Sequence, residues 1–72
     1  MVEYINSKGH AKVISNSVTK RGAIEDILSF CKKNHYDVPY IRINDYPKYW
    51  EFDVGSHTEF FKLYKESDNE EI

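Results

Sequence analysis

Two segments in the second half of the chain alternate apolar and polar residues, which is the pattern of half-buried β-strands. They cover residues 40–43 and 49–52, with residues 44–48 between them. An antiparallel register is predicted with Ile43 opposite Trp50, Arg42 opposite Glu51, Ile41 opposite Phe52 and Tyr40 opposite Asp53. This register gathers apolar side chains on one face and places Arg opposite Glu on the other, as a half-buried strand pair requires.

A second hairpin is predicted at the start of the chain. Residues 2–5 and 11–14 are short runs rich in β-branched and aromatic residues. The segment between them contains Asn6 and Gly9, which suit a hairpin loop of three to five residues.

One segment between the hairpins has the period of an amphipathic helix. Its apolar stripe, spaced i, i+3, i+4 and i+7, consists of Ile24, Ile27, Leu28 and Cys31. Thr19 is the expected N-cap. Asn34 is expected to take the left-handed conformation at the C-terminus, and Pro39 forbids further helix.

The last segment, residues 58–65, has two interpretations. A two-residue turn within residues 54–57 would make it a strand that brings Phe61 and Leu63 into the core. Residues 56–59 also match a capping box, which would begin a helix instead. The strand is favoured because four of the eight residues are aromatic or β-branched.

These elements predict an α+β fold, with one helix packed on an antiparallel sheet of four to five strands in the order ββαββ. Residues 1–65 would form a single domain, with Trp50, Phe52 and Phe61 in its core. Residues 66–72 carry four acids and no base, and they are expected to form a disordered, solubilising tail.

Composition bears on the compartment and the source. The lone cysteine, Cys31, excludes an internal disulfide, and neither a secretory signal nor a membrane span is visible, so a cytoplasmic protein without membrane contact is expected. Ile, Lys, Asn, Tyr and Phe make up 30 of 72 residues. Their codons are AT-rich, a bias typical of small accessory proteins of phages and other mobile elements.

Neither a metal site nor catalysis is predicted. Cys31 and His35 are four residues apart on the helix, and His10 and His57 could complete a zinc site. Structural zinc sites usually show two closely spaced pairs, however, and Cys31 lies in the apolar stripe as a small hydrophobe would. So short a chain also leaves little room for an enclosed pocket. The chain is therefore expected to be a non-enzyme without a cofactor.

The aromatic residues favour a protein-binding role. Of eleven aromatic residues, nine lie between Tyr36 and Tyr64, more than one sheet face needs for a core. The predicted partner-binding residues are Tyr40, Arg42, Tyr46, Tyr49, Phe60 and Tyr64. Tyrosine beside arginine is enriched at interface hot spots. The partner would be another protein or a second copy in a homodimer; alternatively, another element of the fold covers these residues.

Nucleic-acid binding is the alternative function. Its candidate residues are Lys8, Lys12, Lys20, Arg21, Lys32 and Lys33. Without residues 66–72, ten basic side chains face eight acidic ones, a charge of +2. This excess is weak beside that of typical nucleic-acid-binding domains, so the sequence favours a protein partner.

Overall fold

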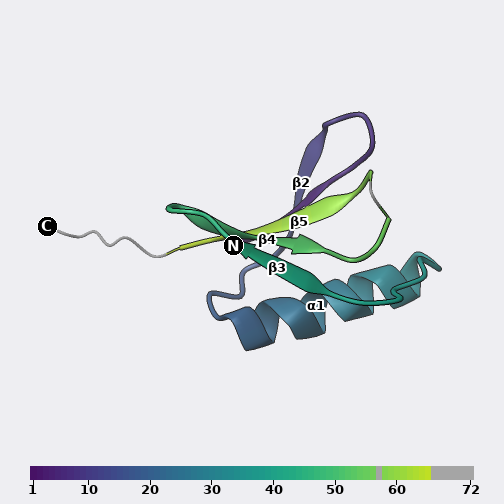
Figure 1. Cartoon of the computed structure of the whole chain (residues 1–72). Coiled ribbons are helices and arrows are strands. Elements are labelled where there is room, and N and C mark those ends of the chain that lie inside the picture. The colour runs from purple at the N-terminus through teal and green to yellow at the C-terminus, as the bar shows by residue number, and fades with distance from the viewer. Residues whose placement is uncertain (57, 66–72) are drawn as a thin grey trace, which may run out of the picture.

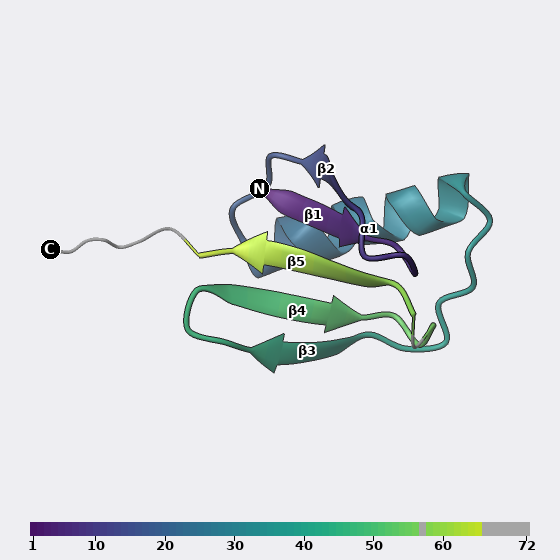
Figure 2. The ribbon, with the colours of Figure 1, turned by 90° about the horizontal axis from the view of Figure 1, so that it is seen from above.

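A computed structural model describes residues 1–56 and 58–65 of the chain, and these residues form an α+β fold (Figure 1). The elements in chain order are β1 (Val2–Ile5), β2 (Ala11–Ser15), α1 (Lys20–Lys33), β3 (Arg42–Asp45), β4 (Tyr49–Asp53) and β5 (Phe60–Tyr64). The strands form one antiparallel sheet of five in the order β2-β1-β5-β4-β3, so β2 and β3 are its edges (Figure 2). The predicted fold class is confirmed.

Helix α1 covers one face of the sheet, and no other element of the described chain lies on the opposite face (Figures 1 and 2). We call these the covered face and the open face. The residues buried on the covered side are Val2, Ala23, Ile27, Cys31, Phe52, Val54, Phe61 and Leu63. Trp50, a predicted core residue, packs against this cluster but remains half-buried at its margin.

The helix begins as predicted. The Thr19 hydroxyl accepts a hydrogen bond from the Gly22 backbone N–H at 3.1 Å and so caps the N-terminus. Ala23, Ile27 and Cys31 form the buried stripe. Leu28 lies outside this stripe with 42% of its surface exposed, because the side of the helix that faces the sheet carries residues 23, 27 and 31.

The end of the helix differs from the prediction. Asn34 has φ −98°, and the left-handed residue is His35, with φ 60°. The Tyr36 N–H donates to the Cys31 carbonyl at 2.8 Å and the His35 N–H donates to the Lys32 carbonyl at 3.2 Å. These two bonds form a Schellman motif, which places the left-handed residue after the cap residue rather than at it.

The register between β3 and β4 also differs from the predicted one. Arg42 pairs with Asp53 and Ile43 with Phe52, a shift of two residues from the predicted pairing. The turn is tighter than expected, since the Tyr46 N–H donates to the Tyr49 carbonyl at 2.9 Å and only residues 47–48 lie between them. Pro47 fixes the φ that the first central position of a common β-turn requires.

The connection from β4 to β5 was predicted too short. Asp53 pairs with Phe60, so the loop spans residues 54–59 rather than a two-residue turn. Gly55 has φ +93°, and a Cβ there would lie 2.8 Å from the Pro39 ring. The loop therefore needs glycine at this position for its conformation and for close packing.

Residues 60–64 form a strand, as the favoured interpretation predicted. The Ser56 hydroxyl does accept a hydrogen bond from the Glu59 N–H at 2.7 Å, which is one half of a capping box. No helix follows, because Phe61 and Leu63 alternate with outward-facing residues and fill the core from β5.

The first hairpin is confirmed in position. The Asn6 side chain accepts hydrogen bonds from the backbone N–H groups of Lys8 and His10 and closes the loop. Ile14 is the extra residue of a β-bulge, since Val2 pairs with Ser15 while the next residue of β1 pairs with Val13. The bulge leaves Ile14 packed against the core.

The part of the chain that the structure describes contains no helix with the length and apolar character of a membrane span. The predicted acidic tail, residues 66–72, lies outside the described residues.

Candidate functional site

The open face is organised in rows that run across the strands. Because directly paired residues share a face, the registers define one row of Arg42, Asp53, Phe60, Ile5 and Ala11; a second of Asn44, Glu51, Lys62, Glu3 and Val13; and a third of Tyr49 with Tyr64, extended by Tyr46 at the turn. The face therefore has a mixed row, a charged row and an aromatic row.

The aromatic row is made of three tyrosines in contact. The rings of Tyr46 and Tyr49 stack with their centroids 5.1 Å apart, and those of Tyr49 and Tyr64 lie 5.8 Å apart. The tight turn after β3 makes the first pair possible, because it places Tyr46 directly across from Tyr49. The Lys62 ammonium lies 4.5 Å from the Tyr49 ring centroid.

Tyr64 is held by a hydrogen bond within this face. Its hydroxyl donates to the Glu3 carboxylate at 2.7 Å. This bond, together with desolvation by burial, raises the pKa of Tyr64 to about 12, so the phenol stays protonated. The hydroxyls of Tyr46 and Tyr49 form no hydrogen bond with the described residues, which leaves them available to a partner.

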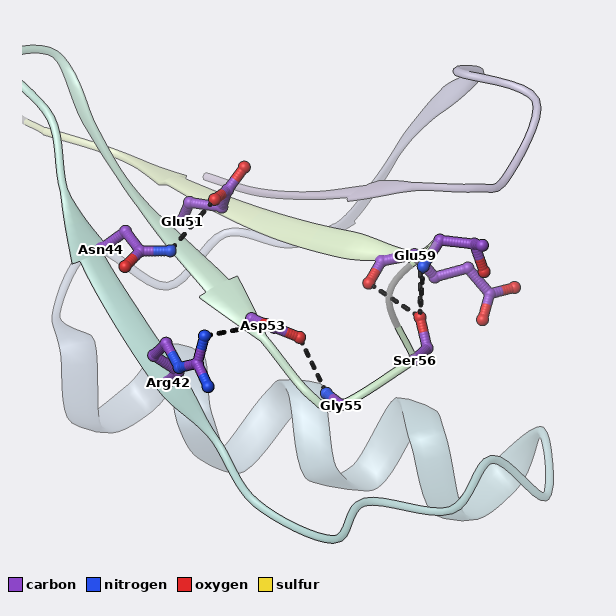
Figure 3. A network of polar contacts seen from close by, with 8 residues as sticks. Arg42, Asn44, Glu51, Asp53, Gly55, Ser56 and Glu59 are labelled. Atoms are coloured by element: carbon purple, nitrogen blue, oxygen red, sulfur yellow. Dashed lines mark hydrogen bonds and ion pairs between the residues drawn. The ribbon is translucent and has the colours of Figure 1, made fainter.

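The carboxylates of the open face are engaged with neighbours (Figure 3). The Asn44 amide donates to Glu51 at 3.2 Å, and the Gly55 N–H donates to Asp53 at 2.8 Å. Arg42 forms its ion pair with Asp53, at 4.0 Å, rather than with Glu51 as predicted, because of the two-residue register shift. The arginine side chain keeps 64% of its surface exposed, so it remains accessible.

Five of the six predicted partner-binding residues lie on the open face. Arg42, Tyr49, Phe60 and Tyr64 belong to its strands, and Tyr46 extends it at the turn. Tyr40 lies before β3 rather than within it, and its ring is 5.4 Å from the Arg42 guanidinium.

Sequence reasoning missed Lys62 and Glu3 as members of this face. Lys62 lies between two outward-facing aromatic residues of β5, so the alternation of that strand could have identified it. Glu3 could not be found this way, since its place beside Tyr64 depends on the pairing of β1 with β5, which the sequence did not reveal.

The predicted nucleic-acid-binding residues are divided. Lys20 and Arg21 begin the fourteen-residue helix and Lys32 and Lys33 end it, which separates the two pairs by roughly 18 Å. Lys12 lines a hollow together with Lys33. The remaining residue, Lys8, is exposed in the first hairpin loop, beyond the end of β1.

An aromatic residue at the margin of the covered face also contacts lysines. The ammonium groups of Lys20 and Lys65 lie 5.2 and 4.8 Å from the Trp50 ring. Lys65 also contacts the Asp45 carboxylate, so its charge is partly compensated.

Cys31 is a core residue, with 1% of its surface exposed. Burial, with a smaller contribution from the Glu59 charge, raises the pKa of its thiol. Within residues 1–56 and 58–65, no three His, Cys, Asp or Glu side chains gather as a metal site would require. His57, considered as a ligand from the sequence, lies outside the described residues.

No protein-family model matches the chain, and comparison with curated proteins and with solved structures gives no match.

Proposed function

We propose that this chain is a non-enzymatic binding protein that recognises another protein through the open face. The observation that carries the proposal is the aromatic row of Tyr46, Tyr49 and Tyr64 on a sheet face that no described helix covers. Exposed aromatic patches mark interaction sites, and tyrosine with a nearby arginine is the composition of binding hot spots. Arg42 supplies the arginine at the β3 edge of this face.

The charge of the open face supports a protein partner over a nucleic acid. Its strands carry two basic side chains, Arg42 and Lys62, and three acidic ones, Glu3, Glu51 and Asp53, a balance of 2 − 3 = −1. Nucleic-acid affinity depends on neutralising phosphates with cations, and this face offers a surplus of carboxylates.

Single-stranded nucleic acid is the second candidate partner. The lysine contacts with Tyr49 and Trp50 support it, because bases stack on aromatic rings while ammonium groups pair with phosphates. The Tyr49 contact lies on the open face and the Trp50 contacts lie at the margin of the covered face. A single strand of nucleic acid would have to pass around the end of the sheet to stack on both rings.

The proposal extends to source and compartment on composition alone. A bias towards residues with AT-rich codons supports a phage or mobile-element protein that modulates or inhibits a host protein. The single, buried Cys31 supports a reducing compartment such as the cytoplasm.

A second copy of the chain could occupy the open face, and solution mass tests this homodimer. Light scattering in dilute solution would give twice 8.6 kDa for a dimer. A monomeric mass at all concentrations would exclude the homodimer and leave the open face free for another protein.

Affinity capture with the unmodified chain and with single-residue variants as baits tests partner recognition. We expect Tyr49→Ala and Arg42→Ala to lose a partner that the unmodified chain captures, with their far-UV circular dichroism unchanged. Lys8→Ala, in the first hairpin loop, is the control and should retain it. Equal capture by Tyr49→Ala would contradict the proposal.

Titration with labelled single- and double-stranded DNA and RNA tests the second candidate. Binding that weakens steeply with salt would support nucleic acid, since phosphate contacts release counterions. Absence of such binding would exclude it.

A further inference from the structure

The edge strand β2 presents free backbone groups. The Asn6 N–H donates to the His10 carbonyl at 3.0 Å, which makes these two residues a hydrogen-bonded pair. Such pairs alternate along an antiparallel ladder, so Lys12 bonds towards β1 while Ala11 and Val13 direct their N–H and C=O groups to the free edge. An exposed edge of this kind is a template for another strand.

A groove runs between this edge and helix α1. Two adjoining hollows, each of about 320 Å³, share Ile14, Phe30 and Lys33 as lining residues. The helix contributes Asp26, Ser29, Phe30 and Lys33, which are spaced i, i+3, i+4 and i+7 and therefore lie on one side of it. Ile14 and Phe30 are both half-buried and pack against the core, so they give the groove an apolar floor.

The groove is electrically asymmetric along its length. Lys12 lines one hollow, Asp26 lines the other beside Ser15, and Lys33 lines both where they adjoin. Because Lys12 shares a hollow with Lys33 while Ser15 shares one with Asp26, helix α1 runs antiparallel to β2 along the groove. Lysines in the last helical turn also offset the partial negative charge of the helix C-terminus.

We propose that this groove binds an extended segment of another protein, which adds to β2 as an antiparallel strand. The free groups of Ala11 and Val13 supply the backbone hydrogen bonds, as in β-strand addition. An apolar side chain of the segment covers Ile14 and Phe30. In an antiparallel strand the second residue after it reaches Lys12, so that residue is Asp or Glu.

The charge at the opposite end extends the recognition pattern. A basic residue two positions before the apolar one lies towards Asp26. The preferred segment therefore reads basic-x-apolar-x-acidic in the N-to-C direction, and the reverse order places its basic residue beside Lys12 and its acidic residue beside Asp26. This site shares no residue with the aromatic row, so its test is independent of the test of the proposed function.

Two capped peptides test the proposal against the full chain. The probe is acetyl-Lys-Thr-Val-Thr-Glu-amide, and the control, acetyl-Glu-Thr-Val-Thr-Lys-amide, has the same composition in reverse. Titration followed by amide chemical shifts should move the signals of Ala11, Val13 and Lys33 with the probe. Its affinity should exceed that of the control by about fivefold, since two ion pairs are exchanged for two repulsions.

Variants separate backbone pairing from charge. Val13→Pro removes an outward-facing N–H without breaking the β1–β2 ladder, and proline is tolerated at such edge positions, so it should abolish binding while the single tryptophan fluorescence stays native. Lys12→Glu should weaken the probe about fivefold. Lys62→Glu, on the open face, is the matched charge reversal and should leave its affinity unchanged.

Absence of shifts at millimolar peptide, equal affinity for probe and control, or unchanged binding to Val13→Pro would each overturn the proposal. Shifts confined to Tyr46, Tyr49 and Tyr64 would also overturn it, because the peptide would then occupy the open face.

Discussion

On the covered face, Phe52, Phe61 and Leu63 are fully buried, whereas their chain neighbours Glu51 and Lys62 on the open face remain half-exposed. The same strands thus supply both an apolar layer under the helix and a layer of tyrosines and paired charges. In a chain this small, one buried layer must provide most of the stability. The open face is therefore free to vary its chemistry for binding.

The largest expected effect is on the covered face. Phe52→Ala removes a fully buried ring and should lower the free energy of unfolding by about 3–5 kcal/mol, close to the whole stability of a small domain. Glu51→Ala, the adjacent residue on the open face, should cost about 1 kcal/mol or less. Urea unfolding followed by tryptophan fluorescence measures both. Equal losses would break the comparison and indicate that the open face is buried by another copy.

A smaller effect is expected on the open face from Tyr64→Phe. The change removes the hydrogen bond to Glu3 but keeps the ring, so stability should fall by about 1 kcal/mol. Tyr46→Phe is the control, since its hydroxyl forms no hydrogen bond with the described residues, and it should be neutral. A neutral Tyr64→Phe would show that water replaces this bond without cost.

The smallest expected effect is the loss of stability at acidic pH that comes from Asp26, at the margin of the covered face. The hydroxyls of Ser15 and Ser17 donate to Asp26 and lower the pKa of its carboxyl. A carboxyl whose folded-state pKa is depressed stabilises the fold above its unfolded pKa, about 4, and loses this contribution as pH falls through the folded value.

The double variant Ser15→Ala, Ser17→Ala should therefore lose less stability than the unmodified chain when urea unfolding is repeated from about pH 6 down into this range. An identical pH profile would show that the two hydroxyls do not stabilise the Asp26 carboxylate.

The sequence determined which residues share a face. Side chains alternate along a strand with a period of two, so Ile43, Trp50 and Phe52 were correctly placed on one face although the predicted register was wrong by two residues. The helix and its Thr19 cap were also predictable, since helix periodicity and capping depend on residues a few positions apart.

Only the tertiary structure decided the pairing of strands distant in sequence. Placing β5 between β1 and β4 brings Tyr64 to Glu3 and joins the two hairpins into one sheet. It also decided that β2 is an edge with α1 beside it, which creates the groove. These features depend on how separate elements pack together, and local sequence patterns carry no information about contacts between segments that the chain brings together only on folding.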